Sequence, residues 1–459
     1  MKQRRAQSAG RNRVETRVEQ PRSAPSRIVE IEKPIYGGAF LARVEGKAVF
    51  VPLTLPGEQA RVRITEDKRG YASAEADEIV TAAAERIVPA CRHFGACGGC
   101  HYQHAGYATQ LAFKQAILRE TLERGGVRVT DEIAVIGAPT ESQSWAYRNR
   151  IRLAFDAAGN PGYRGRRSHA VIPIAECPIA APLLVEAAQR FAETAKQFSP
   201  ALRPTEISLF CNADETSLLA SVFTAGVAKN SVNSFDDFAR ALAEQIPALK
   251  GMELIAEEHP GERRAQTSSR TIAQWGEASL VYRAAGFDYR VDHGAFFQVN
   301  RWLVDALVDR VTGGQQGALA WDLFAGVGLF AHRLAESFAR VVAVESAPSA
   351  TAALQENLQG TTGSAVRAAT LDFLRRAPKS DRPDLIVVDP PRTGLGAEIT
   401  TLLAGIAAPA LTYVSCDPAT LARDLRALIA SGYAIESLAL ADLFPLTFHL
   451  ETVVQLRRS

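Results

Sequence analysis

The sequence predicts an α/β protein of three parts: a small amino-terminal β-barrel, a central α+β segment and a doubly wound, Rossmann-like carboxyl-terminal domain. At 459 residues the chain is too long for one ordinary core. From Ala318 onward, short apolar runs alternate with helical stretches, which is typical of a parallel sheet covered on both faces. Between residues 28 and 88, apolar and polar residues instead alternate in short runs, which indicates a small antiparallel barrel.

The barrel prediction for residues 28–88 rests on four runs of alternating residues and on the glycines between them. The breaks fall at Gly37-Gly38, Gly46, Gly57 and Gly70, where tight turns can form. The runs are Arg27–Ile31, Ala48–Val51, Ala60–Ile64 and Ala74–Val80. A barrel of this size often binds nucleic acid, although it can also serve as a structural cap.

Residues 1–27 carry eight Lys and Arg against two Glu, and they show no apolar periodicity. We expect a disordered basic arm that either contacts phosphate or is only solvated. The chain has no run of about 18 apolar residues, and its basic start lacks the apolar core of a signal peptide. We therefore expect a cytoplasmic protein without a membrane segment.

The central segment, residues 89–295, begins with three closely spaced cysteines, Cys91, Cys97 and Cys100. Gly98-Gly99 lets the backbone turn tightly around a shared centre, and Cys177 can supply a fourth thiolate. Four thiolates suit either a tetrahedral zinc ion or an iron-sulfur cubane, and the spacing leaves both open. Six cysteines in a chain of this size do not indicate a disulfide framework.

Two further patterns in the central segment concern its elements. A helical pattern covers Tyr107–Arg124. The Gly/Arg-rich stretch Gly159–Arg167 is expected to form an exposed hairpin tip. Its arginines could meet phosphates, or the turn could simply be solvated.

The carboxyl-terminal domain, residues 296–459, is predicted from its buried strands. The expected strands are Ala318–Leu323, Arg340–Val344, Leu385–Val388, Leu411–Val414, residues 435–440 and Thr452–Leu456. Open α/β sheets bind ligands at the carboxyl ends of their strands, so the residues that follow these strands are candidates for a site.

The turn after the first of these strands contains Gly326-Val327-Gly328, whose glycines let the backbone approach a ligand closely. Ala331 replaces the third glycine of a nicotinamide fingerprint. Glu345 ends the next strand, where a carboxylate can accept both hydroxyls of a ribose, and Asp372 is placed to meet an adenine amino group. Because no further phosphate-binding element is present, S-adenosylmethionine fits better than a dinucleotide. A nicotinamide site is the minor alternative.

Two more strands lead into reactive groups. The loop Asp389-Pro390-Pro391-Arg392 is held extended by its prolines, which fixes the aim of Asp389. A related loop with an aromatic residue in place of Arg392 suits amino-group methylation, so Arg392 argues against that reaction. Cys416 follows the next strand, and a thiolate beside a methyl donor suits addition to carbon 6 of a pyrimidine, which activates carbon 5. A buried core thiol is the alternative for a lone cysteine.

Five motifs in this order resemble the bacterial uracil-5 RNA methyltransferase family, and most of all its 23S ribosomal RNA branch. The motifs are Phe296–Asn300, Asp322–Gly328, Asp389–Gly394, Ser415–Asp424 and Phe444–Val453. The barrel resembles a TRAM domain, and the carboxyl-terminal domain resembles a class I methyltransferase. Together these likenesses span about residues 28–459.

The resemblance implies an enzyme that methylates carbon 5 of a uridine in RNA. It implies that Cys416 adds to uracil carbon 6 and that Glu451 removes the carbon 5 proton. It also implies a [4Fe-4S] cluster on the four cysteines, ahead of zinc. Leu329 is a departure, because the family often has an asparagine there. The residues that the resemblance places around S-adenosylmethionine, or at its junction with uracil, are Gln298, Phe324, Glu345, Asp372 and Asp389.

RNA is therefore the expected partner, with 23S ribosomal RNA first and transfer RNA as the alternative. The target base is expected to leave its stack to reach the thiol. Two other functions stay open: a noncatalytic RNA-binding protein on the same fold, and amino-group methylation, for which Cys416 should be dispensable. No obligate protein partner is expected.

Overall fold

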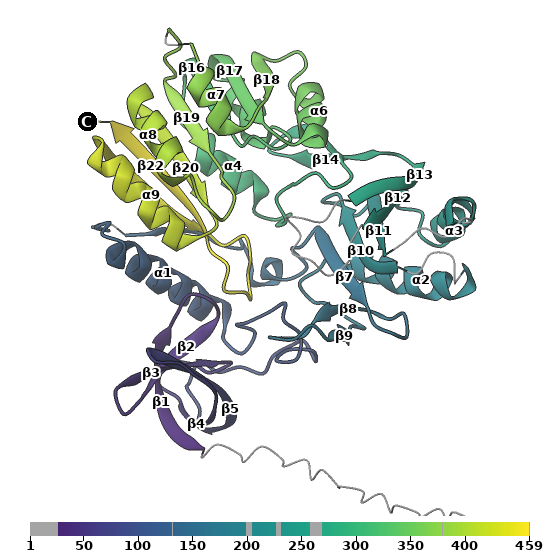
Figure 1. The fold of residues 1–459 in the computed structure, drawn as a ribbon, viewed down its shortest axis with the longest axis vertical. Coiled ribbons are helices and arrows are strands. Elements are labelled where there is room, and N and C mark those ends of the chain that lie inside the picture. Colours follow the sequence, from purple (N-terminus) through teal and green to yellow (C-terminus); the bar gives the residue numbers. More distant parts are fainter. Residues whose placement is uncertain are drawn as a thin grey trace, which may run out of the picture. The chain divides into compact units, whose positions relative to one another are not determined.

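The computed structural model describes residues 26–130, 132–198, 204–225, 231–257, 269–378 and 380–458 (Figure 1). The expected basic arm lies outside these described residues, apart from its last two. Contacts between residues divide the chain into two compact units. The smaller unit contains Met1–Lys33 and Phe40–Ala82, and the larger one contains Pro34–Ala39 and Ala83–Ser459. The turn Pro34–Ala39 thus belongs to the larger unit, although the strands on either side of it lie in the smaller one.

The smaller unit is a closed barrel in the order β1-β2-β3-β5-β4. Its strands are β1 (Arg27–Pro34), β2 (Ala39–Val44), β3 (Lys47–Pro52), β4 (Gln59–Asp67) and β5 (Tyr71–Thr81). Alternate side chains such as Val29 and Ile31 fill its interior. β2 is missing from the expected runs because four consecutive residues, Ala39–Ala42, are buried and show no alternation. The barrel also differs from the antiparallel prediction in one pair, since β3 runs parallel to β5.

The central part of the larger unit is built on a seven-stranded sheet in the order β13-β12-β11-β10-β7-β8-β9. Its strands are β7 (Arg150–Phe155), β8 (Pro161–Arg164), β9 (Val171–Pro173), β10 (Pro204–Cys211), β11 (Leu218–Thr224), β12 (Leu249–Glu257) and β13 (Ser269–Gly276). Helices α2 (Pro182–Phe198) and α3 (Ser231–Gln245) pack against it through a core that includes Phe191, Phe238 and the buried Cys211. The stretch Gly159–Arg167, predicted as one hairpin tip, covers strand β8 and parts of two turns. One turn, around Asp156–Asn160, joins β7 to β8, and the other, which begins at Gly165 and contains Arg166 and Arg167, joins β8 to β9.

The remaining elements of the central segment lie outside this sheet. Helix α1 spans Tyr107–Arg124, the bounds that the sequence predicts. The other elements are β6 (Ala134–Ile136), the 3₁₀ helix η1 (Glu141–Ser144) and the hairpin of β14 (Ser279–Ala284) with β15 (Phe287–Asp292).

The carboxyl-terminal domain holds an eight-stranded sheet in the order β18-β17-β16-β19-β20-β22-β21-β6. Its own strands are β16 (Gly317–Leu323), β17 (Phe338–Glu345), β18 (Gly363–Arg367), β19 (Leu385–Val388), β20 (Ala410–Ser415), β21 (Tyr433–Ala441) and β22 (Glu451–Arg458). β16 to β20 are parallel to one another. β22 differs from the parallel prediction, because it enters antiparallel between β20 and β21. All six expected strands are present, whereas β18 and the pairing of β6 are additional.

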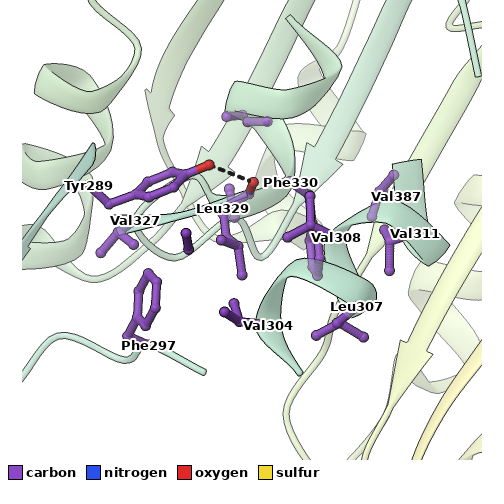
Figure 2. Close-up of a cluster of buried hydrophobic side chains, with 14 of the residues drawn as sticks. Tyr289, Phe297, Val304, Leu307, Val308, Val311, Val327, Leu329, Phe330 and Val387 are labelled. Atoms are coloured by element: carbon purple, nitrogen blue, oxygen red, sulfur yellow. Dashed lines mark hydrogen bonds between the residues drawn. The ribbon is translucent and has the colours of Figure 1, made fainter. Parts of the chain in front are cut away.

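Helices cover both faces of this sheet, which confirms the doubly wound prediction. On one face lie α4 (Val304–Thr312), α5 (Leu329–Leu334) and α6 (Pro348–Asn357). On the other lie α1, α7 (Thr370–Arg376), α8 (Gly396–Ile406) and α9 (Pro418–Ala430). Figure 2 shows the first face, where Val387 of β19 meets Val308 and Val311 of α4. The neighbours of Val387 in β19, Ile386 and Val388, belong to the core on the opposite face, because successive side chains of a strand alternate between the two faces of a sheet.

Candidate functional site

The ends of four strands bring the predicted catalytic residues to one edge of the eight-stranded sheet. Val388 pairs with Leu323 on one side and with Tyr413 on the other, so β16, β19 and β20 end side by side. β22 runs in the opposite direction and therefore begins at this edge. Ser415 of β20 pairs with Thr452 of β22, and this is the last pair of the ladder. Cys416 follows Ser415 and Glu451 precedes Thr452, so both residues lie at this end of the two strands.

Cys416 lies at the junction of buried strand β20 and helix α9. Asp417 caps this helix, because its Oδ1 accepts the N–H groups of Ala419 (3.0 Å) and Thr420 (2.9 Å). Burial raises the pKa of the Cys416 thiol to about 12, and the carboxyl groups of Glu451 and Asp389 add to the rise. Arg392 opposes it. The thiol therefore needs a neighbouring cation, or the loss of a neighbouring negative charge, to ionise.

The buried carboxyl group of Glu451 and the partly exposed one of Asp389 both act on this thiol. The Glu451 side chain is buried at 5% exposure, and burial raises its pKa well above the usual range. The charge of Asp389 raises the pKa of Glu451 further, and Arg392 lowers it. Burial also raises the pKa of Asp389 to about 7. A carboxyl group whose pKa is raised is, once ionised, a stronger base than an ordinary carboxylate.

Arg392 brings a guanidinium to this acidic cluster. One of its nitrogens, Nη2, lies 3.2 Å from Nδ1 of His449. Burial, with the charge of Arg392 as the next cause, lowers the pKa of His449 to about 3, so the imidazole is neutral and can accept this hydrogen bond. The hydroxyl of Thr420, on α9, donates to the backbone oxygen of Arg392 (3.2 Å). The helix that follows Cys416 thus also holds the Asp389–Arg392 loop.

The predicted cofactor residues Phe324, Gly326 and Glu345 meet at the ends of β16 and β17. The N–H of Gly326 donates to Oε2 of Glu345 (3.0 Å). Phe324 and Gly326 both have positive φ, +66° and +56°, which turns the chain sharply after β16. A Cβ added at Gly326 would meet no atom within 4 Å, so the loop leaves open space for a ligand. A loop with open space at Gly326, next to the carboxylate of Glu345, fits the ribose part of S-adenosylmethionine.

The remaining predicted cofactor residues, Gln298 and Asp372, lie on separate elements. Gln298 is buried, and its backbone oxygen accepts a hydrogen bond from Asn149 Nδ2 (2.9 Å). Asp372 begins α7 with a side chain that is 52% exposed. The next residue, Phe373, packs edge-on against Trp321 of β16, with ring centroids 5.0 Å apart. This contact ties the start of α7 to the strand that leads into the glycine turn.

Leu329, directly after the glycine turn, occupies the position where the resemblance leads us to expect an asparagine. Leu329 is buried, and its backbone oxygen accepts a hydrogen bond from Tyr289 (3.2 Å), as Figure 2 shows. Val327 and Phe297 belong to the same buried cluster. The position is thus part of the core rather than a polar contact to the cofactor.

The four predicted ligand cysteines line one pocket of about 210 Å³ in the larger unit. Tyr163 and Arg148 line the same pocket, and the Tyr163 hydroxyl lies 3.7 Å from Sγ of Cys177. Within the described ranges, no three or more His, Cys, Asp or Glu side chains are placed to hold a metal ion. Burial raises the pKa of three of these thiols, Cys91, Cys97 and Cys100. The four cysteines thus line one shared pocket.

Comparison with known proteins gives consistent matches along the chain. Residues 379–459 match the family described as tRNA (Uracil-5-)-methyltransferase, and residues 27–76 match the TRAM domain. The chain is 32% identical over 460 residues to an uncharacterized RNA methyltransferase of Streptomyces avermitilis, covering 93% of this chain and 96% of that protein. It is 31% identical over 447 residues to the 23S rRNA (uracil(1939)-C(5))-methyltransferase RlmD of Halomonas elongata, covering 94% and 89%. The chain belongs to the RNA uracil-5 methyltransferase family.

The fold of this uracil-5 methyltransferase is shared with a solved structure. The tRNA (uracil-54, C5)-methyltransferase of Pyrococcus abyssi, in complex with S-adenosyl-L-homocysteine, aligns with a TM-score of 0.72 and 23% identity. The alignment covers 93% of this chain and all of that one. As a member of its family, the protein is an S-adenosylmethionine-dependent enzyme that acts on RNA. None of its described helices combines the length and the apolar character needed to cross a membrane.

Sequence reasoning missed three groups at the site of this uracil-5 methyltransferase. Asp322, at the end of β16, is fully buried, and burial raises its pKa to about 7. His449 lies within a recognised motif, but its contact with Arg392 depends on the folded loop. Tyr36 donates a hydrogen bond to Oδ2 of Asp417 (3.4 Å) from 381 positions away. The glycines after Tyr36 indicate a turn, but nothing in the sequence places that turn beside Cys416.

Proposed function

We propose that this enzyme methylates carbon 5 of a uridine in 23S ribosomal RNA, with Cys416 as nucleophile and Glu451 as base. The observation that carries the proposal is that Cys416 and Glu451 adjoin the last paired residues of β20 and β22, Ser415 and Thr452, at the ligand-binding edge of the sheet. Relatives from Halomonas elongata and Klebsiella pneumoniae, both named as 23S rRNA methyltransferases, support the choice of RNA. Transfer RNA is the alternative, because the family match over residues 379–459 carries that name.

Covalent activation begins with ionisation of the Cys416 thiol. Arg392 lowers the pKa of this thiol, so its guanidinium is the group that stabilises the thiolate against Glu451 and Asp389. The sulfur then forms a bond to carbon 6 of the uracil, and the electron pair of the 5,6 double bond moves toward carbon 5 and the carbonyl at carbon 4. S-adenosylmethionine supplies the electrophilic methyl group that carbon 5 accepts.

Release of the product needs a base beside the thioether. The Glu451 carboxylate removes the proton from carbon 5, the electron pair of that C–H bond restores the double bond, and the S–C6 bond breaks. The thiolate of Cys416 is thereby regenerated. The raised pKa of Glu451 suits this step, because a carboxylate that binds protons more tightly is a stronger base.

The proposed cofactor site lies beside this reaction centre. Glu345 and Gly326 would bind the ribose, and Asp372 would bind the adenine. Phe324, Gln298 and Asp389 would line the junction with the uracil. The bond between Gly326 N–H and Glu345 and the open space at Gly326 support this assignment.

We also propose a [4Fe-4S] cluster bound by Cys91, Cys97, Cys100 and Cys177, with zinc as the lesser alternative. One observation supports a shared site: all four cysteines line one pocket of about 210 Å³. Four thiolates suit an iron-sulfur cubane or a tetrahedral zinc ion, and the resemblance of the sequence to its family favours the cubane.

The direct test incubates the purified protein with S-adenosylmethionine and with transcripts of 23S ribosomal RNA and of transfer RNA, and measures 5-methyluridine in each. We expect the product in 23S ribosomal RNA. Cys416→Ala should form none, whereas the control Cys211→Ala, which changes a buried core thiol, should retain activity. Methylation by Cys416→Ala at the wild-type rate would refute the covalent mechanism, and product confined to transfer RNA would refute the choice of substrate.

The role of Glu451 is tested in the same assay by denaturing electrophoresis. Glu451→Gln should still bind RNA covalently through Cys416 but should release it slowly. RNA should therefore stay attached to the denatured protein in the presence of S-adenosylmethionine. A Glu451→Gln enzyme that turns over normally would show that another group removes the proton.

A further inference from the structure

The turn Pro34–Ala39 is the part of the amino-terminal region that lies in the larger unit. It joins β1 to β2, and its glycines, Gly37 and Gly38, have φ of +104° and +85°. A Cβ at Gly38 would come within 2.6 Å of His101 and 3.1 Å of Phe448, so glycine permits a very close approach. This docked turn presents the side chain of Tyr36.

The hydroxyl of Tyr36 reaches the residue next to the nucleophile. It donates a 3.4 Å hydrogen bond to Oδ2 of Asp417, whose Oδ1 caps α9. The Ser415 hydroxyl donates to the backbone oxygen of Asp417 (3.2 Å), so residues on both sides of Cys416 are fixed. Burial, together with the charges of Asp417 and Cys416, raises the pKa of Tyr36 above its usual value. The phenol therefore stays protonated and can act only as a donor to a carboxylate.

The ring of Tyr36 reaches the loop that leads to the base. It packs edge-on against Phe448, with centroids 5.6 Å apart. The ring of Phe448 also packs against the ring of His449, with centroids 4.3 Å apart, and this histidine lies two residues before Glu451. One side chain thus contacts both the loop after Cys416 and the loop before Glu451.

We propose that Tyr36 is a positioning residue that fixes Cys416 relative to Glu451, through its hydroxyl to Asp417 and its ring to Phe448. The inference rests on the proposed roles of Cys416 and Glu451. Addition of sulfur to carbon 6 depends on the distance and angle of attack, and small displacements of a reacting group cost large factors in rate. Tyr36 touches none of the reacting atoms, so its effect should fall on the rate of the covalent step and leave RNA binding unchanged.

The test measures the single-turnover rate at which the full-length enzyme becomes crosslinked to RNA that contains 5-fluorouridine, with S-adenosylmethionine present. Tyr36→Phe removes the hydroxyl and should slow crosslinking about 3- to 10-fold, the effect of one ordinary hydrogen bond, because the bond to Asp417 is long at 3.4 Å. Tyr36→Ala also removes the ring and should slow it toward about 100-fold. The dissociation constants of RNA and of S-adenosylhomocysteine should stay within about twofold of wild type for both variants.

Tyr433→Phe is the matched control, because Tyr433 likewise donates one hydrogen bond, to the backbone oxygen of Ala408 (2.9 Å). It should not alter the crosslinking rate. The positioning role is overturned if Tyr36→Phe and Tyr36→Ala both crosslink at the wild-type rate. It is also overturned if their crosslinking rates fall only by the factor by which their affinity for RNA falls.

A double-mutant cycle tests whether Tyr36 acts through Asp417. Asp417→Ser keeps a helix cap but removes the second carboxylate oxygen. In that background, Tyr36→Phe should have no further effect, and additive effects would overturn the proposed route. The cycle uses conservative changes, so it remains decisive if Tyr36→Ala does not fold. A wild-type enzyme that never crosslinks overturns both this inference and the role of Cys416, whereas normal crosslinking by the Tyr36 variants overturns this inference alone.

Discussion

At the scale of single residues, the chemistry depends on where protons lie among Cys416, Glu451 and Asp389. Burial raises the pKa of all three groups, so each favours its neutral form. In the proposed mechanism only one of them becomes an anion at a given step, the thiol at the start and Glu451 at the end. Arg392 lowers the pKa of both groups, so it favours the anionic form of each.

We expect the rate of crosslinking to 5-fluorouridine RNA to rise with pH. A thiol with a pKa near 12 is mostly protonated at neutral pH, so its thiolate fraction grows about tenfold per unit between about pH 6 and 9. Arg392→Gln removes the charge that lowers this pKa and should reduce the rate across that range. The control Arg457→Gln, which breaks an ion pair with Glu436 on exposed side chains, should not. A rate that is flat over this range would mean that the thiolate is already formed in the complex.

At the scale of elements, the segment between β21 and β22 carries His449 to the site and leads directly into Glu451. It contains few regular hydrogen bonds of its own, and buried side chains from elsewhere hold it. Lys114 of α1 forms a buried ion pair with Asp442 and also donates to the backbone oxygen of Phe444 (2.9 Å). Tyr147 donates to the oxygen of Pro445 (3.0 Å).

Lys114→Met should therefore destabilise the protein strongly. It leaves the Asp442 carboxylate buried without its partner, which costs about 3–5 kcal/mol. Urea unfolding should show the loss as a lower midpoint. The double variant Lys114→Met/Asp442→Leu removes both charges and should recover much of the stability. A single variant as stable as wild type would show that the ion pair does not hold the loop.

The elements that carry the site could be predicted from the sequence, but the way they meet could not. Buried strands such as β19 and β20 show as short apolar runs, so the positions of Asp389 and Cys416 at strand ends followed directly. The apolar pattern of β22 does not reveal its direction, and only its antiparallel entry brings Glu451 to the same end of the sheet as Cys416. The contact between Tyr36 and Asp417 joins opposite ends of the chain, which no local pattern encodes.

At the scale of the whole molecule, the cysteine pocket links parts of the larger unit that are distant in sequence. Its walls come from residues 91–103, from Cys177 and its neighbours, and from His449. His449 also contacts Arg392, so the pocket lies one side chain away from the group that assists Cys416. A cluster bound there would contact the loop before Glu451 through His449. Because methyl transfer needs no electron transfer, we propose that such a cluster would have a role in structure or in RNA folding.

The protein purified without oxygen should accordingly contain about four iron and four acid-labile sulfide per chain, with the visible absorbance of a cluster. Cys177→Ser removes a ligand at the far wall of the pocket and should lower both the iron content and the melting temperature. The control Cys211→Ser alters a cysteine buried in the core of the seven-stranded sheet, so it should leave the iron content unchanged. Added chelator should reproduce the thermal destabilisation in the wild type, because a group bound only by the folded chain stabilises it by mass action. One zinc per chain without sulfide would refute the cluster in favour of a single zinc ion. If the protein contains no metal and added chelator leaves its melting temperature unchanged, both proposals are refuted.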